Sequence, residues 1–281
     1  MPGYLKGTVR SADGTTIGYR QYGSGPGLIL AHGGMKAGQH LSALAAGLSG
    51  RFRVHVPDRR GRGLSGPHGT AYGMQREVED LQALIAATGA QCIFGHSSGA
   101  LVSLRAALSV PALDRVAVYE PPLPVGGSVP TDWLPRFDRE IAAGRRAAAA
   151  VTARKGCRIE PTFAQLPRWL LTGAGAVGLR AQNTHDDEVP IADLIPTMHF
   201  DVQIVQEMAD TAPQYAALQV PVLLLGGTKI PGYLSVALRE LAAVLPHAQR
   251  VTLHGLDHSG PEDDGSPLMV ATVLSDFFTT P

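Results

Sequence analysis

The chain has 281 residues, of which 24 are lysine or arginine and 24 are aspartate or glutamate, so its formal net charge is zero. This length suffices for one large hydrophobic core, and the balanced charge gives no reason to expect nucleic acid or an anionic membrane surface as a partner. No apolar run is long enough to span a membrane, and the two cysteines form no disulfide framework. Residues 1–6 also lack the apolar segment of a signal peptide, so we expect a cytoplasmic protein that is a monomer or a homodimer.

Short apolar runs alternate along the chain with stretches of helical periodicity. Residues 5–9 and 16–22 flank the turn sequence Ala-Asp-Gly and predict an antiparallel hairpin. The other predicted strands are residues 28–31, 53–56, 93–94, 116–119, 220–225 and 250–253, and the predicted helices are 40–48, 72–88, 100–108 and 234–245. Because these strands are apolar throughout, they predict a mostly parallel sheet covered by helices on both faces, which is an α/β fold.

The segment of residues 123–213 breaks this alternation. It has no clear strand, and its helical stretches are residues 133–151, 163–171 and 204–209. We expect a helical insertion that lies over the sheet as a lid. The core would then be formed by residues 1–122 and 214–281.

Residues 91–99 (QCIFGHSSG) place an apolar strand directly before a G-x-S-x-G sequence, and a helical pattern begins at Ala100. This context of strand, tight turn and helix raises a serine above the edge of a sheet as a nucleophile. Gly95 and Gly99 would leave room for a strained backbone at Ser97, and the helix start would offer amides to a developing oxyanion. Taken alone, the sequence is equally consistent with a serine in an ordinary glycine-rich turn.

Three further motifs accompany it in a fixed order: residues 32–35 (HGGM), 58–65 (DRRGRGLS) and 255–260 (GLDHSG). Together with residues 95–99 (GHSSG), they resemble the landmarks of the alpha/beta-hydrolase family, and the resemblance runs almost from end to end. It implies an eight-stranded, mostly parallel sheet with helices on both faces and a helical lid. It also implies a hydrolase for a small-molecule substrate that uses neither a metal nor an organic cofactor.

A serine hydroxyl is a poor nucleophile until a neighbouring base removes its proton. His258 is the expected base, because it follows the last strand, where the family places its histidine. His254 is expected to be structural, and His96 to pack beneath the turn of the nucleophile. His32 is expected to anchor the glycine loop that follows it through hydrogen bonds.

The oxyanion hole is expected to consist of two backbone amides. One belongs to Ser98, directly after the nucleophile, and the other comes from the loop of residues 32–34, with Gly34 as the first choice. A simple flexible turn is the alternative for this loop.

The expected acid departs from the commoner pattern of the family. The loop after the seventh strand, residues 226–232 (GGTKIPG), has no carboxylate. Glu120 ends the sixth strand before two prolines, and it resembles the triad glutamate of zearalenone lactonases, whose nucleophile turn is similar to residues 97–100 (SSGA). The resemblance implies Glu120 as the acid that orients His258. The alternative is a rim or buried glutamate that only caps the start of the insertion.

Other acidic residues are expected to stay outside the catalytic group. Asp257 should face away from the base, and residues 262–264 (EDD) are expected to be exposed loop charge. Residues 185–188 (HDDE) have no ligand spacing on a helix, so a solvated loop is expected there rather than a metal site.

These roles predict a serine hydrolase that cleaves an ester, a lactone or a thioester of a small, largely apolar molecule through an acyl-enzyme. The alternatives are a lyase, a hydrolase of carbon–carbon bonds, or a small-molecule receptor that retains the triad. An apolar pocket above Ser97 would be lined by side chains of the insertion, although a place in the insertion's own core is an alternative for each. These side chains are Trp133, Phe137, Trp169, Met198 and Phe200.

Overall fold

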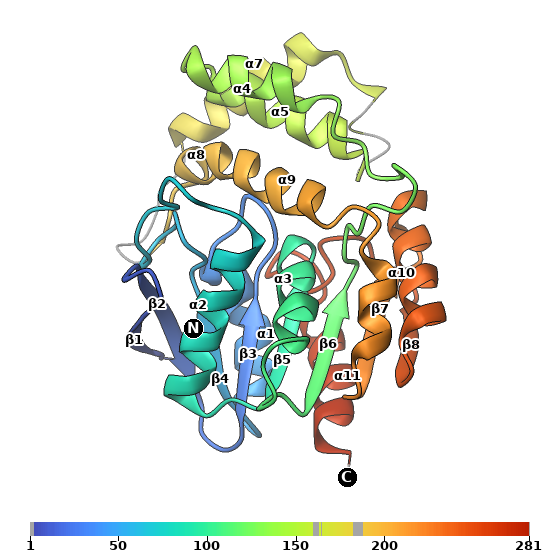
Figure 1. Cartoon of the computed structure of the whole chain (residues 1–281). Helices are drawn as coiled ribbons and strands as arrows, with labels where there is room; N and C mark the ends of the chain where they lie inside the picture. The colour runs from blue at the N-terminus through green and yellow to red at the C-terminus, as the bar shows by residue number, and fades with distance from the viewer. Residues whose placement is uncertain (1–2, 160–162, 164, 182–187, 281) are drawn as a thin grey trace.

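In the part of the chain that the computed structural model describes, residues 3–159, 163, 165–181 and 188–280, eight strands form one sheet (Figure 1). They are β1 (Leu5–Arg10), β2 (Thr16–Tyr22), β3 (Gly27–Ala31), β4 (Arg53–Pro57), β5 (Cys92–His96), β6 (Arg115–Tyr119), β7 (Val222–Gly227) and β8 (Ala248–Leu253). Their order is β1-β2-β4-β3-β5-β6-β7-β8. The hairpin of β1 and β2 is antiparallel, β2 is antiparallel to β4, and the remaining pairs are parallel. The predicted hairpin and the mostly parallel sheet are confirmed.

The central strands are apolar throughout because the sheet is buried on both faces. Successive side chains of a strand point to opposite faces, so Ile29 and Ile93 join one hydrophobic core while Leu28 and Phe94 join the other. All four side chains are fully buried. A strand whose two faces both pack against a hydrophobic core has apolar side chains at every position and does not alternate with polar ones.

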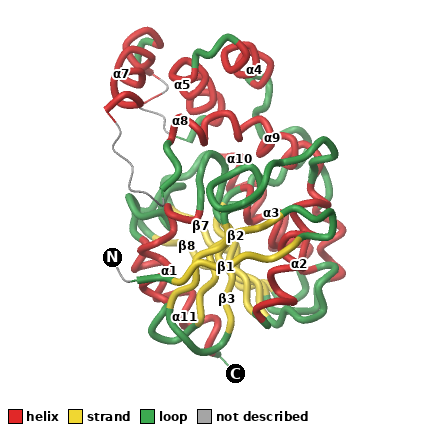
Figure 2. The backbone as a smooth tube through the Cα atoms, turned by 90° about the vertical axis from the view of Figure 1, so that its left-hand side faces the viewer, coloured by secondary structure: helices red, strands yellow, loops and turns green. Residues whose placement is uncertain are grey.

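Helices cover both faces of the sheet, as Figure 2 shows from the side. On one face, α1 and α11 pack against each other, and on the other face α2, α3 and α10 contribute to the larger core. The bounds are α1 (Ser42–Leu48), α2 (Met74–Thr88), α3 (Ser98–Ala107), α10 (Gly232–Val244) and α11 (Pro267–Thr279). Short 3-10 helices span Gly38–Leu41, Ile195–Thr197 and Ala212–Ala217.

The segment between β6 and β7, residues 123–213, is called the insertion below. Its helices stand above the carboxyl ends of the strands in Figure 1. They are α4 (Leu134–Ala142), α5 (Arg146–Cys157), α7 (Arg168–Ala181), α8 (Ile191–Leu194) and α9 (Met198–Glu207). The single helix predicted over residues 133–151 is wrong. The chain turns at residues 143–145, where Gly144 takes a φ of 70°, and α5 then packs against α4.

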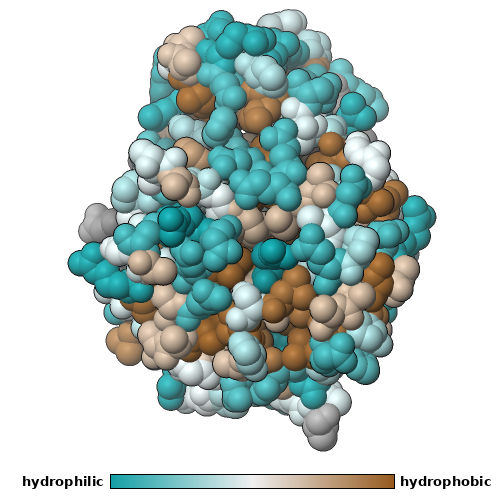
Figure 3. All heavy atoms as spheres, in the orientation of Figure 1, coloured by the Kyte–Doolittle hydropathy of each residue, from teal (hydrophilic) through white to brown (hydrophobic). Residues whose placement is uncertain are grey.

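The face of the molecule in Figure 3 mixes hydrophilic and hydrophobic side chains. Most of the large apolar side chains that stand exposed belong to the insertion, and Trp169 on α7 is the extreme case at 77% exposure. Among the described residues, no helix is long and apolar enough to cross a lipid bilayer.

Candidate active site

Ser97 lies in the turn between β5 and α3 with φ 53° and ψ −124°. This backbone conformation is strained for any residue with a side chain, so the surroundings must hold it in place. A Cβ on Gly95 would lie 2.5 Å from the carbonyl oxygen of Gly99, and one on Gly99 would lie 2.4 Å from that of His32. Both glycines are therefore sterically required, as the sequence predicts.

His258 lies in the loop after β8, and Glu120 directly follows β6. The Nδ1 atom of His258 is 2.7 Å from Oε2 of Glu120, while the backbone N–H of Gly227 donates to Oε1 at 2.7 Å. Glu120 is completely buried, so it is no rim residue, and its own φ is 49°. Because the carboxylate accepts the Nδ1–H, the imidazole has Nε2 as the nitrogen with which it can accept a further proton.

Ser97 and His258 both line a cavity of about 780 Å³ beneath the insertion. Gly34 and Ser98 belong to the wall on the sheet side, so four of the five residues with expected catalytic or oxyanion roles meet here. The opposite wall is mainly apolar. Its members include Ala147, Ala150, Ala153, Leu171, Ala174, Leu179, Ile195 and Val202.

Gly34, in the loop of residues 32–35, carries the first of the two amides that the sequence predicts for an oxyanion hole, and this residue lines the cavity. The N–H of the next residue, Met35, donates to Asp201 at 3.2 Å. The second amide, that of Ser98, lies in the first turn of α3, where N–H groups have no partner within the helix.

His32 anchors this loop as the sequence predicts. Its Nε2 atom accepts the N–H of Arg59 at 3.1 Å, and its Nδ1–H therefore donates to the carbonyl of Gly33 at 2.9 Å. Burial, together with the charges of Arg62 and Arg59, holds the pKa of His32 well below its usual value. The ring is thus neutral and carries one donor and one acceptor, which is what this position requires.

The structure brings two of the five predicted pocket residues into the cavity wall, Trp133 and Met198. Phe137 is fully buried in a small core of the insertion, and Trp169 points to solvent. Phe200 stacks on His68 with the ring centroids 3.7 Å apart. Residues two positions apart lie on nearly opposite sides of a helix, so Met198 and Phe200 of α9 cannot both face the cavity.

The sequence-based view of residues 262–264 is wrong for Glu262, which is 4% exposed and lines the cavity. One of its oxygens lies 2.5 Å from Nζ of Lys36 and the other 3.6 Å from Nδ1 of His96. Asp263 and Asp264 are exposed as expected, and Asp263 accepts the N–H of Ala43 at 2.8 Å. The ammonium group of Lys36 supplies the neutralising charge that allows Glu262 to be buried.

The remaining histidines and acidic residues near the candidate site have structural or surface positions. His96 is buried, and its Nε2–H donates to the carbonyl of His258 at 2.8 Å, which supports the loop of the base from below. His254 and Asp257 are exposed, and the backbone carbonyl of Asp257 accepts the hydroxyl of Tyr119. Residues 185–187 lie outside the described part of the chain.

Sequence reasoning missed a buried ionic cluster beside the cavity. Arg59 binds Glu77 of α2 through two hydrogen bonds of 2.9 and 2.8 Å, and its Nη1 atom also donates to Asp201 at 2.9 Å. Arg62 donates to the same aspartate at 2.6 Å. The motif of residues 58–65 marks this loop, but no local signal links it to a residue of α9 more than 130 positions away.

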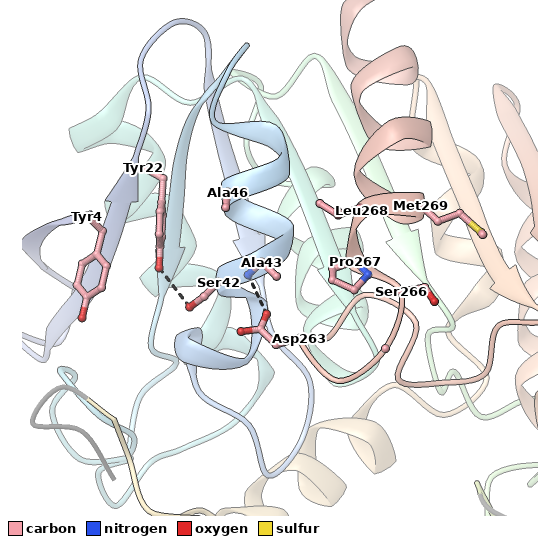
Figure 4. A pocket seen from close by; sticks show the side chains of 11 residues that line it. Tyr4, Tyr22, Ser42, Ala43, Ala46, Asp263, Ser266, Pro267, Leu268 and Met269 are labelled. Carbon is pink, nitrogen blue, oxygen red and sulfur yellow. Dashed lines mark hydrogen bonds between the residues drawn. The ribbon is translucent and has the colours of Figure 1, made fainter. Parts of the chain in front are cut away.

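A second hollow of about 550 Å³ lies between α1 and the start of α11 (Figure 4). Tyr22 and Ser42 meet there at 3.3 Å between their hydroxyl oxygens, beside the contact of Asp263 with Ala43. Ser97 and His258 do not line this hollow, whereas both line the cavity under the insertion.

Comparison with known proteins agrees with this geometry. Residues 28–271 match the model of a family described as "Alpha/beta hydrolase family". The chain is 27% identical over 249 residues to a 2-(acetamidomethylene)succinate hydrolase of Mesorhizobium japonicum, which covers 86% of this chain and 85% of that protein. It is 28% identical over 241 residues to a pimeloyl-[acyl-carrier protein] methyl ester esterase of Xanthomonas campestris, covering 84% and 89%.

Among solved structures, an alpha/beta hydrolase from Sphaerobacter thermophilus superposes with a TM-score of 0.76 at 32% identity, over 97% of this chain and all of that one. The sheet order, the strained turn at Ser97 and the matched segment point to the same assignment. The chain belongs to the alpha/beta hydrolase family.

Proposed function

We propose that this hydrolase cleaves a carboxylic ester, lactone or thioester of a small, largely apolar molecule through an acyl-enzyme on Ser97. One observation carries the proposal: His258, whose Nδ1 atom lies 2.7 Å from Glu120, shares a cavity wall with a serine held in a strained turn. A nucleophile, a base and a group that orients the base are the three parts that acyl transfer through a serine requires.

In this mechanism Nε2 of His258 takes the hydroxyl proton as Oγ of Ser97 attacks the carbonyl carbon. The carbonyl π electrons move to oxygen, and the amides of Gly34 and Ser98 stabilise the oxyanion. Collapse of the tetrahedral intermediate expels the alcohol or thiol, which receives the proton from His258. Water then attacks the acyl-enzyme with the same base, and the acid and free Ser97 are released. Glu120 accepts the Nδ1–H of His258 and stabilises the imidazolium in both halves of the reaction.

The cavity supports a small and mainly apolar substrate. Its volume of about 780 Å³ is within the usual range for small-molecule sites, and Trp133 and Met198 are among the apolar side chains on its wall. One relative is named for a methyl ester, which supports an ester among the possible acyl compounds. We further propose that the insertion acts as the lid of this cavity and that the core consists of residues 1–122 and 214–281.

The test is covalent labelling together with turnover. A fluorophosphonate should modify Ser97, abolish hydrolysis of p-nitrophenyl esters, and give an adduct that mass spectrometry places on this residue. The Ser97→Ala variant should neither react nor turn over. Labelling at another residue, or full activity of Ser97→Ala, would overturn the proposal, and one slow event followed by tight product binding would indicate a receptor.

A further inference from the structure

The two chain segments that carry the proposed oxyanion-hole amides both form a hydrogen bond with the same carboxylate, which belongs to the insertion. Asp201 of α9 accepts the N–H of Met35 through Oδ2 at 3.2 Å and the hydroxyl of Ser98 through Oδ1 at 3.0 Å. Met35 directly follows Gly34, and Ser98 itself carries the second amide. One side chain therefore contacts the two segments that must stay a fixed distance apart to receive an oxyanion.

This carboxylate is held in place from the other side by two arginines. Asp201 is 2% exposed, and Arg59 and Arg62 donate to its two oxygens at 2.9 and 2.6 Å. Burial alone would raise the pKa of Asp201, but the charges of Arg62 and Arg59 outweigh it and hold this pKa below its usual value. Asp201 is thus an ionised group with fixed hydrogen-bond partners and not a mobile surface acid.

The glycine loop rests directly on Asp201. A Cβ on Gly34 would lie 3.2 Å from Cγ of Asp201, so loop and carboxylate are already in close contact. Met35 has a φ of 51°, a conformation that a residue with a side chain adopts only when its surroundings impose it. The hydrogen bond from Met35 to Asp201 provides such a constraint directly beside Gly34.

We propose that Asp201 is a positioning residue that sets the separation of the Gly34 and Ser98 amides, so that the insertion takes part in transition-state stabilisation. This inference rests on the function proposed above. It assigns α9 a role beyond covering the cavity, because a displacement of α9 would move both amides. Oxyanion stabilisation depends on donors placed at the position of the developing charge, so a small displacement lowers kcat more than it changes substrate binding.

The decisive variant is Asp201→Asn, with Glu207→Gln as its matched control. Glu207 lies on the same helix, and its carboxylate accepts the N–H of Met74 at 2.7 Å, but it does not line the cavity. Loss of one oxyanion donor costs about a hundredfold or more in kcat, so we expect a tenfold to hundredfold loss in Asp201→Asn, with KM within about threefold. Glu207→Gln should keep kcat within about twofold.

A second variant covers the case that Asp201→Asn does not fold, since Arg62 would lose its neutralising partner. Ser98→Ala keeps both ion pairs of Asp201 and the Ser98 amide but removes the hydroxyl, which donates to Asp201 at 3.0 Å and accepts a hydrogen bond from Nη1 of Arg59 at 2.9 Å. It should lower kcat about tenfold while circular dichroism and thermal melting stay close to the wild type. Retention of kcat within twofold in Ser98→Ala, or in a folded Asp201→Asn, would overturn the inference.

Two readouts separate this inference from the proposed function. A trifluoromethyl ketone, which forms a tetrahedral adduct on the serine, should bind Asp201→Asn about tenfold or more weakly, whereas a product acid should bind almost equally well. A fluorophosphonate should label Ser97 at a rate reduced by a similar factor. If the wild type itself does not react, the proposed function fails. If wild type and variant react at equal rates, only the role of Asp201 fails.

Discussion

The Oε2 atom of Glu120 and the Nδ1 atom of His258 lie 2.7 Å apart although 138 positions separate the two residues in the chain. Glu120 is fully buried, and its second oxygen accepts the N–H of Gly227. The loop after β7 has no carboxylate, and in its place a glycine of β7 supplies a hydrogen bond to the glutamate of the neighbouring strand. Both oxygens of Glu120 thus act as acceptors.

Replacing Glu120 by glutamine should therefore lower kcat by about a hundredfold or more, because the imidazolium loses its counter-charge. An amide has one oxygen for two N–H donors, so its NH₂ group must face either Gly227 or His258. We expect a lower melting temperature as well as slower turnover, measured with p-nitrophenyl esters on protein that is shown to be folded. Asp257→Asn is the control and should cost far less. Near-full activity of Glu120→Gln would contradict its role.

Trp133 and Trp169 form a natural pair for testing the cavity, since Trp133 lines it and Trp169 is exposed on α7. Trp133→Leu should change the ratio of kcat/KM values among esters of different acyl chains by about tenfold, which corresponds to roughly 1.4 kcal/mol of differential binding. Trp169→Leu should leave these ratios within twofold. Equal effects of Trp133→Leu on every ester would indicate a scaffold residue.

The Lys36–Glu262 ion pair predicts that two variants differ in how their stability depends on pH. Burial raises the pKa of Glu262, and the charge of Lys36 opposes that rise. A carboxyl whose pKa is raised in the folded state loses stabilising effect as pH increases through that pKa. Lys36→Met should raise the pKa of Glu262 further, because the opposing charge is lost. In urea unfolding, this variant should be less stable than wild type by about 1–3 kcal/mol at pH 8 and closer to wild type at pH 5.

Glu262→Gln removes the buried carboxylate beside Lys36, and Lys36, with 28% of its side chain exposed, can turn to water. Its difference from wild type should therefore be small and should not grow with pH between 5 and 8. A Lys36→Met variant whose deficit stays constant over this range would contradict the assigned burial of Glu262.

His55 on β4 predicts sensitivity of the fold to acid. Burial, with a smaller effect of Arg53, lowers the pKa of His55 to about 4, and neither ring nitrogen has a hydrogen-bond partner among the described residues. A histidine whose pKa is lowered in the folded state contributes stability above about pH 6.5, and this contribution is lost as pH falls toward 4. Leucine has no such proton to gain.

His55→Leu should consequently raise the free energy of unfolding by about 1 kcal/mol at pH 7, because an unpaired polar ring is removed from the core. The loss of stability between pH 6.5 and 4.5 should also be smaller than in wild type. Thermal melts at several pH values measure both effects. A steeper acid dependence in the variant would show that the ring is paired in solution.

Much of the fold and part of the site were predictable because the causes are local. An apolar run before G-x-S-x-G requires a buried strand and a tight turn, and a Cβ on Gly95 would meet the carbonyl oxygen of Gly99, only four residues further on. The absence of a carboxylate in residues 226–232 directed attention to Glu120, which the structure places next to His258. Such features depend on backbone conformation and on the identity of near neighbours in the chain.

Contacts between residues far apart in sequence were decided only by the tertiary structure. Asp201 and Arg59 are 142 positions apart, and Lys36 and Glu262 are 226 apart, so no local pattern reveals that these charges neutralise each other. A carboxylate in a loop sequence is expected to be solvated unless its partner is known, and the partner of Glu262, Lys36, lies in a distant part of the chain. The direction of an aromatic side chain in the insertion likewise depends on how each helix packs. The sequence by itself indicated the family and the candidate reacting groups, because these follow from short motifs, while long-range packing and charge pairing decided which residues surround them.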